Sequence, residues 1–560
     1  MLKLKLNPAT YEDNFNMWLK RLSDEKIINR IWNKDYTVWR DDPTEISNRL
    51  GWLDCVETAK DKLDEINGFV DEIISEGFTH ALLLGMGGSS LAPEVFSKIL
   101  GTQNGFLKLS VLDSTHPDQV NRMLKELNPA KTLYIVSTKS GGTVETISFM
   151  KRFYNTVMKN AGKENVGNHF VAITDPGSGL EATAKKLNFR KIFINDPNIG
   201  GRYSALSLFG LVPAALIGTD LVKLLNRVEE VIVLTKADNN SIAQIGVALG
   251  MLAEQGVDKA TFILSNKFKP FGAWVEQLIA ESTGKEGKGI LPVEGEEILK
   301  PENYGKDRVF ININLKDDNN YHDKIAELKS AGFPVIEIEL NEIYQLGAQY
   351  FAWEMITVIA SWVINIQPFD QPNVEEAKVI ARKMMSEYFE KGELPKQTPA
   401  LNNNGINVLG NTGAESIEKV LPDFLTPAIK GKNYVAIQAY VEMNNKAKNI
   451  LHLLRTKIQR KYGVAVTVGF GPRFLHSTGQ LHKGDAGNGL FVQFVSQSKV
   501  DVEIPDEAGK DKSTMTFGVL IKAQAIGDRE ALLANNRKVI TFEITENVVD
   551  DISKIFSELN

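Results

Sequence analysis

Short apolar runs alternate with longer segments of helical periodicity over most of this 560-residue chain. Runs in which nearly every position is apolar, separated by helical patterns, are typical of parallel strands buried on both faces. The first region of this kind therefore predicts a doubly wound sheet with helices on both sides. Its expected strands are residues 81–84, 108–113, 132–137, 169–175 and 191–196.

A second alternation of the same kind follows, and it ends in a long apolar helix expected over residues 343–366. Its expected strands are residues 260–265, 308–315 and 334–340. Residues 391–405 are rich in Pro, Asn and Gly, so we interpret them as a linker. Beyond the linker a third α/β pattern has expected strands at residues 433–441, 464–470, 489–495 and 538–544.

This pattern divides the chain into several folding units, because one hydrophobic core rarely organises more than ~100–200 residues. The predicted fold is α/β, with two doubly wound parallel sheets and a further C-terminal α/β domain. An apolar helix over residues 202–221 is expected near the end of the first sheet. The expected parts are an N-terminal helical arm (1–70), a first unit (71–240), a second unit (241–390), the linker (391–405) and a C-terminal unit (406–560).

The composition excludes several classes of protein. Hydrophobic residues make up 43% and charged residues 24%, which is typical of a soluble globular protein. The net charge of −6 argues against nucleic-acid binding. Residues 206–217 and 355–366 are the most apolar runs, and both are shorter than the ~20 residues of a membrane helix.

The chain shows no sign of export. Its N-terminus lacks the apolar segment of a signal peptide. Cys55 is the single cysteine, so no intrachain disulfide can form, which fits a reducing compartment. We expect a cytoplasmic protein without membrane or nucleic-acid partners.

Two glycine-rich turns follow neighbouring expected strands. The first, GMGGSS at residues 85–90, opens a helix and favours an anion near backbone amides, although a dinucleotide fingerprint would place glycine at Ser90. The second, STKSGGTVET at residues 137–146, combines hydroxyl groups with two glycines. Such a turn fits a monoester phosphate, or else a Ser/Thr-capped structural turn. Ligands of open α/β sheets bind at the carboxyl ends of strands, which favours binding.

Three further segments carry polar candidates for chemistry. Gln277 and Glu281 are four residues apart on an expected helix, so they share a face. Arg202 precedes the apolar helix, and Gln371 and Lys378 lie in the turn-and-helix segment PFDQPNVEEAK. Taken singly, Glu281 is better explained as a solvated carboxylate and Lys378 as a surface lysine. Arg202 could also form a cap or an interdomain ion pair.

Together these segments resemble the glucose-6-phosphate isomerase family. GMGGSSLAP, TKSGGTVET, GGRYS, ESTGK and FDQPNVEEAK correspond in order to the glycine–serine, phosphate, arginine, glutamate and lysine motifs of the family. The resemblance covers residues 85–378 and implies a pair of sugar-isomerase (SIS) domains. It implies interconversion of glucose 6-phosphate and fructose 6-phosphate by ring opening and a cis-enediol intermediate.

The resemblance also implies roles for single residues. Glu281 would move the proton, and Arg202 would stabilise the enediolate. Ring opening would fall to Lys378 and to His322, which otherwise is a plain surface histidine. The implied substrate-binding residues are Gly88, Ser89, Thr138, Lys139, Ser140, Gly141, Gly142, Thr143, Gln277 and Gln371. No metal or organic cofactor is implied, and the expected assembly is a homodimer.

The C-terminal segment GFGPRFLHSTGQLHKGDAGNG, residues 469–489, resembles the extension of bifunctional transaldolase/glucose-6-phosphate isomerases. Its basic side chains, from Arg473, His476, His482 and Lys483, would bind a second anion, complete an interface or belong to a structural loop. Two histidines without cysteine or an acidic loop provide too few ligands for a metal site.

Two other functions remain open at this point. One is a phosphosugar-binding regulator with the SIS fold but no chemistry, and the other is an isomerase of another phosphosugar. A regulator would not need Glu281, Arg202 and Lys378, yet the sequence has all three. A dehydrogenase ranks below both, because the last glycine of its fingerprint is missing.

Overall fold

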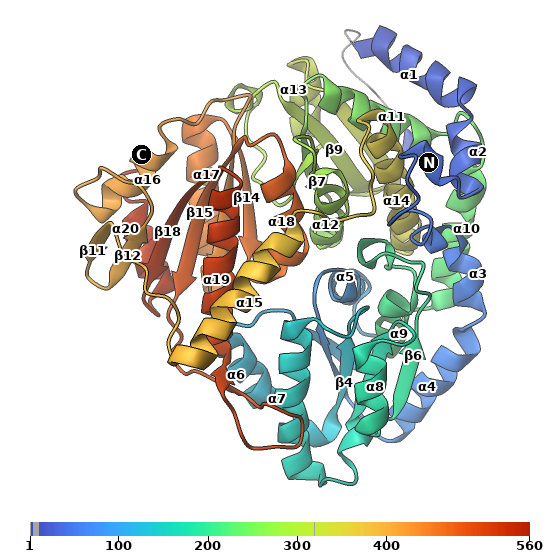
Figure 1. Cartoon of the computed structure of the whole chain (residues 1–560). Helices are drawn as coiled ribbons and strands as arrows, with labels where there is room; N and C mark the ends of the chain where they lie inside the picture. The colour runs from blue at the N-terminus through green and yellow to red at the C-terminus, as the bar shows by residue number, and fades with distance from the viewer. Residues whose placement is uncertain (1, 4–10, 319, 560) are drawn as a thin grey trace.

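Three sheets organise the computed structural model, which describes residues 2–3, 11–318 and 320–559. Of residues 2, 3 and 376–378 it describes the backbone alone. In Figure 1 the first sheet lies below, and the second and third sheets lie side by side above it. No helix of the described ranges is long and apolar enough to cross a membrane.

The first sheet is parallel, in the order β3-β2-β4-β5-β6, and confirms the expected doubly wound unit. Its strands are β2 (His80–Gly85), β3 (Lys108–Leu112), β4 (Thr132–Ser137), β5 (Phe170–Thr174) and β6 (Lys191–Ile194). The helices of this unit are α5 (Leu91–Leu100), α6 (Pro117–Glu126), α7 (Val144–Ala161), α8 (Gly179–Lys186) and α9 (Leu208–Leu216). Leu82 and Leu83 point into different hydrophobic clusters, which explains why this strand reads as continuously apolar.

The second sheet has the order β1-β10-β9-β7-β8, in which only β1 is antiparallel to its neighbour. Its strands are β1 (Leu2–Lys3), β7 (Lys259–Leu264), β8 (Leu291–Val293), β9 (Arg308–Leu315) and β10 (Val335–Leu340). Strand β8 was not expected, because it has three residues and contains Pro292. The helices here are α10 (Leu221–Thr235), α11 (Ser241–Glu254), α12 (Phe271–Thr283), α13 (His322–Ser330) and α14 (Gln345–Val363).

The third sheet runs β11-β12-β18-β15-β13-β14. Its strands are β11 (Leu401–Asn403), β12 (Ile406–Leu409), β13 (Tyr434–Tyr440), β14 (Ala465–Phe470), β15 (Gly489–Ser496) and β18 (Lys538–Ile544). A small separate sheet pairs β16 (Glu503–Ile504) with β17 (Met515–Thr516). The helices are α16 (Ile417–Leu425), α17 (Asn445–Tyr462), α18 (Gly479–Gly484), α19 (Phe517–Ala534) and α20 (Val548–Ile555).

Residues 401–405, at the end of the predicted linker, form strand β11 and the turn that joins it to β12. Asn404 and Gly405 make the two-residue turn with φ of 52° and 82°. Positive φ at both positions is the turn conformation that Asn-Gly favours between paired strands. The sequence therefore contained a hairpin signal within a stretch that composition alone marks as a linker.

The N-terminal arm is helical, as expected, with α1 (Glu12–Asp24), α2 (Ile27–Trp32), α3 (Cys55–Lys60) and α4 (Leu63–Ser75). Cys55 is buried, and this burial raises the pKa of its thiol. The expected helix over 202–221 is wrong in its bounds: Gly201–Tyr203 is a 3-10 turn, and α9 begins only at Leu208. Arg202 therefore lies in a tight turn ahead of the helix.

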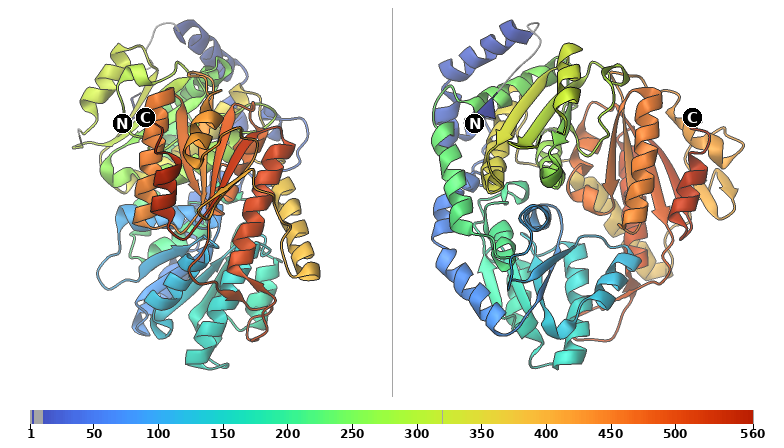
Figure 2. Two further views of the ribbon diagram at one scale, coloured as in Figure 1. Left: turned by 90° about the vertical axis from the view of Figure 1, so that its left-hand side faces the viewer. Right: turned by 180° about the vertical axis from the view of Figure 1, so that it is seen from behind.

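The C-terminal unit is packed closely against the rest of the chain. Helix α15 (Val374–Lys391), which we expected in the second unit, lies alongside α19 (Figure 1). Phe517 of α19 stacks on Phe149 of α7, so the C-terminal unit contributes to the core of the first. Figure 2 shows the same arrangement from the side and from behind.

Candidate active site

A pocket of about 570 Å³ opens where the carboxyl ends of β2 and β4 meet the second and C-terminal units. This is the edge at which open α/β sheets bind ligands. Of the residues predicted for the site, it is lined by Gly88, Ser89, Thr138, Lys139, Ser140, Thr143, Arg202, Gln277, Glu281 and Gln371. Residues far apart in the sequence therefore share one cavity.

The glycines of the first loop permit close packing. A Cβ on Gly88 would lie 2.0 Å from the carbonyl oxygen of Gly201. Gly87 has φ of 53°, and its Cβ would lie 2.8 Å from the carbonyl oxygen of His476. Only glycine allows both approaches, so this loop brings the Arg202 turn and the C-terminal unit to the pocket.

The second loop presents hydroxyl groups ahead of α7. Thr138 Oγ1 and Thr143 Oγ1 lie 2.9 Å apart, and the amide of Gly142 donates to Ser140 Oγ over 3.3 Å. Gly141 has φ of 71°, which lets the loop turn beside α8. Thr143 occupies the N-cap position of α7 without a capping side-chain bond. Amides at such a helix start favour an anion.

Lys139 lines the same pocket but is already paired. Its ammonium forms an ion pair with Asp175 and donates to the carbonyl of Pro197 over 2.8 Å. Burial raises the pKa of Asp175, whereas Lys139 opposes that change. The lysine therefore fixes the rim of the pocket between β4 and the turn after β5.

Glu281 lines the same pocket as the hydroxyl-rich loop and is 6% exposed. Its Oε1 lies 3.3 Å from Nη1 of Arg202, and its Oε2 accepts from Nε2 of Gln277 over 3.0 Å. Arg202 is 2% exposed and is held by Ser282 Oγ at 2.8 Å and by the carbonyl of Pro368 at 2.7 Å. A carboxylate and a guanidinium are thus fixed side by side in a cavity.

Two polar groups of the pocket wall are available to a ligand. Gln277 Nε2 also donates to the carbonyl of His476 over 2.8 Å, whereas its buried Oε1 has no hydrogen-bond partner in the described ranges. Gln371 lines the same pocket and is exposed. Both amides are therefore placed to bind hydroxyl groups.

Two of the catalytic residues predicted for the site are not found at the pocket: the structure places one elsewhere and does not describe the side chain of the other. His322 begins α13 with 80% of its side chain exposed, and it does not line the pocket. Its sequence position before a helix and a strand resembled the family pattern, but α13 lies on the far side of the second unit (Figure 1). Lys378 belongs to α15, and its side chain lies outside the described part of the structure.

The histidine that does reach the pocket is His476, from the C-terminal unit. Its Nε2 lies 2.9 Å from Oε1 of Glu145 in the first turn of α7. Glu145 is buried and also accepts from Nε2 of Gln524 over 2.7 Å. In the sequence, His476 was only one of several basic residues in its segment. Its partner Glu145 lies in the first unit, so the local sequence could not indicate their contact.

The other basic residues of that segment serve internal contacts. Arg473 pairs with Glu94 and with Asp113, the latter at 3.0 Å. Lys483 pairs with Asp528 over 2.6 Å in the core. His482 is 3% exposed, and burial lowers its pKa well below the usual value. Arg473 therefore joins the C-terminal unit to the first unit, whereas Lys483 and His482 belong to the interior of the C-terminal unit itself.

A metal centre is not built from these side chains. Over the described ranges, no three His, Cys, Asp or Glu residues are grouped so as to hold a metal ion. What the pocket does provide is hydroxyl groups, helix amides, a buried carboxylate and a buried guanidinium.

Most of these groups lie in a part of the sequence that matches the model of a known protein family. Residues 50–290 match the model of the phosphoglucose isomerase family. This stretch is therefore similar to the phosphoglucose isomerase family. It contains both glycine-rich loops, Arg202, Gln277 and Glu281, whereas Gln371, Lys378 and His476 lie beyond its end.

Relatives of the phosphoglucose isomerase stretch extend the likeness. The chain is 26% identical over 386 residues to a probable glucose-6-phosphate isomerase of Methanococcus maripaludis, covering 61% of this chain and 85% of that protein. It is 26% identical over 387 residues to the glucose-6-phosphate isomerase of Campylobacter jejuni, covering 61% and 93%. A crystal structure of a glucose-6-phosphate isomerase from Chlamydia trachomatis shares the fold, with a TM-score of 0.55, 18% identity and coverage of 67% and 86%.

Proposed function

We propose that this protein interconverts glucose 6-phosphate and fructose 6-phosphate. The observation that carries the proposal is a single pocket in which Glu281 and Arg202 face the hydroxyl-rich loop from Thr138 to Thr143. The named relatives support the same activity. Aldose–ketose isomerisation needs an anion site, a base and a group that stabilises an oxyanion, and the pocket offers all three.

The phosphate binds in this proposal at the start of α7. Ser140, Thr143 and Thr138 donate hydroxyl hydrogen bonds, and the helix amides add their partial positive charge. Ser89 contributes from the neighbouring loop. Because Lys139 is paired with Asp175, we assign most of the phosphate binding to neutral hydrogen-bond donors.

Ring opening requires proton transfer between the ring oxygen and the anomeric hydroxyl. We assign it to His476, because it is a histidine of the pocket and its Nε2 is within bonding distance of a buried carboxylate. Donation from Nε2 to Glu145 leaves Nδ1 to exchange a proton with the substrate. Lys378 stays a predicted assistant in this step.

The isomerisation itself moves one proton. Glu281 takes the proton from C2 of the open aldose, and the electron pair of that bond forms the C1–C2 double bond of the enediolate. Arg202 stabilises the negative oxygen, since its guanidinium is fixed beside the carboxylate. A proton passes from the C2 hydroxyl to the C1 oxygen. Glu281 then returns its proton to C1, and the electron pair left on the C2 oxygen forms the ketone. Gln277 and Gln371 orient the hydroxyl groups.

Nothing is oxidised or reduced overall in this sequence, so no co-reactant is consumed. The test is to incubate the purified full-length chain with glucose 6-phosphate in heavy water and to follow the products by NMR. We expect fructose 6-phosphate to form, with solvent deuterium appearing at the exchanged carbon. Binding without turnover would instead indicate a phosphosugar-binding regulator, and turnover of another phosphosugar alone would reassign the substrate.

Three further inferences accompany this activity. The single cysteine supports a cytoplasmic enzyme. The resemblance to the family supports a homodimer, which sedimentation will test. The segment of residues 469–489 supports an extension of the kind found in bifunctional transaldolase/glucose-6-phosphate isomerases.

A further inference from the structure

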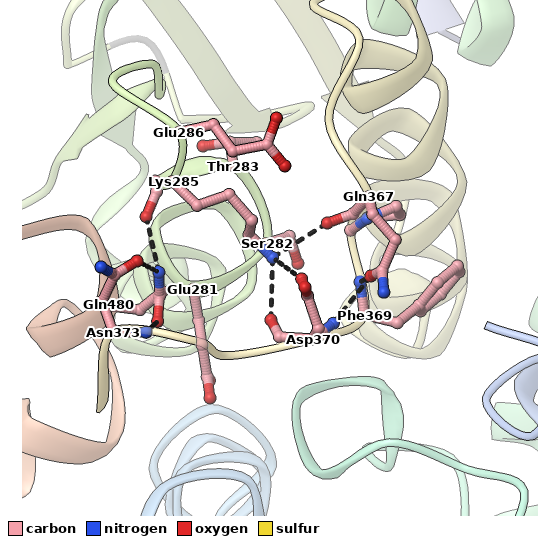
Figure 3. Close-up of polar contacts among 12 residues, drawn as sticks. Glu281, Ser282, Thr283, Lys285, Glu286, Gln367, Phe369, Asp370, Asn373 and Gln480 are labelled. Atoms are coloured by element: carbon pink, nitrogen blue, oxygen red, sulfur yellow. Dashed lines mark hydrogen bonds and ion pairs between the residues drawn. The ribbon is translucent and has the colours of Figure 1, made fainter. Parts of the chain in front are cut away.

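Lys285 is fully buried four residues after Glu281, just beyond the end of α12. Its ammonium donates to the carbonyl of Gln367 at 2.9 Å, to the carbonyl of Asp370 at 2.8 Å and to Oδ1 of Asp370 at 2.6 Å. All three acceptors belong to the turn that leads to Gln371. Figure 3 shows these bonds converging on one nitrogen, while Glu281 points away from them.

Gln480 makes a second connection between the same two segments, from α18 of the C-terminal unit. Its Nε2 donates to the carbonyl of Gly284 over 2.9 Å and to Oδ1 of Asn373 over 2.7 Å. Its Oε1 accepts from the backbone amide of Asn373 over 2.9 Å. The side chain is fully buried, so both ends of the amide are held (Figure 3).

We propose that Lys285 and Gln480 are positioning residues that together hold the end of α12, with Glu281, against the turn that carries Gln371. This inference rests on the proposed function. It gives the C-terminal unit a specific task in catalysis, because Gln480 reaches the active-site walls from outside both SIS-like sheets. We call this pair the α12 clamp.

Arg202 shows why the clamp bears on chemistry. It donates to the carbonyl of Asp370 over 3.2 Å, the same oxygen that Lys285 binds, and to Ser282 next to Glu281. A shift of the turn therefore moves the guanidinium that faces Glu281. Misplacement of reacting groups by about 1 Å can cost on the order of 100-fold in rate.

The clamp also has a titratable member. The pKa of Lys285 is lowered to about 8, mainly by burial and also by Arg202, whereas Asp370 and Glu281 act in the opposite direction. These are the charged groups that face its ammonium from the 3-10 turn, the Gln371 turn and α12. Above this pKa the lysine loses its charge, so the turn is held less firmly as pH rises.

The first test compares the Lys285→Met variant with Lys288→Met in the full-length chain. Lys288 also binds a backbone carbonyl, that of Ile364 at the end of α14, over 2.9 Å. Unlike Lys285, however, it is 44% exposed. We expect Lys285→Met to lower kcat by about 10- to 100-fold with little change in KM, and Lys288→Met to leave both unchanged. Equal kcat values in wild type and Lys285→Met would refute the clamp.

The pH profile separates positioning from a merely structural role. Wild type should lose kcat on the alkaline side with an apparent pKa near 8. Asp370→Asn removes the carboxylate that favours the charged lysine, so the alkaline limb should move to lower pH. An alkaline limb that stays in place in Asp370→Asn would overturn the assignment of Lys285.

Gln480→Leu tests the contribution of the C-terminal unit. Hydrogen exchange over residues 365–373 should rise in Gln480→Leu and in Lys285→Met, but not in Lys288→Met. This measurement needs no turnover, so it judges the clamp even if wild type proves inactive and the proposed function fails. Unchanged exchange in both variants would show that neither residue holds the turn.

Discussion

Nε2 of His476 lies 2.9 Å from Oε1 of Glu145, joining the C-terminal unit to the first turn of α7. The contact places an imidazole at the pocket that also contains Glu281. A buried carboxylate favours one tautomer and holds the ring. Replacing His476, or the Glu145 carboxylate that holds its ring, should therefore slow ring opening.

His476→Gln should lower the rate of isomerisation by at least about 100-fold, which is a usual contribution of a general acid–base group. His322→Gln should leave the rate unchanged, since that side chain is 80% exposed and outside the pocket. Ring opening and closing exchange the two anomers, so NMR exchange between them measures this step alone. A fast anomer exchange in His476→Gln would assign ring opening to another group.

Glu281→Gln should remove most of the turnover, by about 10³-fold, while the affinity for phosphosugars is retained. Glu276→Gln is a matched control on the same helix. Burial and the neighbouring Glu294 raise the pKa of Glu276 well above the usual range, which favours a neutral form similar in shape to glutamine. If the Glu276 variant loses as much activity as the Glu281 variant, helix packing rather than proton transfer would explain both.

Ser140→Ala and Thr143→Ala should each weaken phosphosugar binding about 10-fold or more, because a hydrogen bond to a charged group contributes about 1.5–3 kcal/mol. Calorimetric titration with glucose 6-phosphate measures the effect, and unphosphorylated glucose should show none. Thr156→Ala, farther along α7, removes only a bond to the carbonyl of Arg152 and is the control. Unchanged affinity in the first two variants would move the phosphate elsewhere.

Glu296→Gln should destabilise the protein by about 3 kcal/mol, because it leaves a buried arginine charge without its partner. Both oxygens of Glu296 lie 3.0 Å from the guanidinium of Arg308, and one accepts from the amide of Val466 in the C-terminal unit. The urea midpoint of unfolding measures the loss.

The control for that change is Glu229→Gln, which breaks an ion pair with Lys60. Both side chains are 44% exposed there, and exposed pairs contribute at most about 1 kcal/mol. A similar midpoint for both variants would mean that burial of the Arg308–Glu296 pair carries no extra stability.

The type and order of the main elements could be predicted from the sequence. Strands β4 and β9 have the bounds expected from their apolar runs, since a strand buried on both faces is apolar at nearly every position. The shorter elements could not be predicted in this way. Strand β8 has too few residues for a pattern, and the β11–β12 hairpin was hidden in a polar segment.

The sequence by itself determined that the two glycine-rich loops, Arg202 and Glu281 lie at strand ends and helix termini, which parallel topology brings to one edge. Only the tertiary structure places His476, rather than His322, at the pocket, and only it shows the buried hydrogen bonds of Lys285 and Gln480. The contacts of His476 and Gln480 depend on how the C-terminal unit packs against α7 and the end of α12. Periodicity records which face of an element is buried, but not which distant segment buries it.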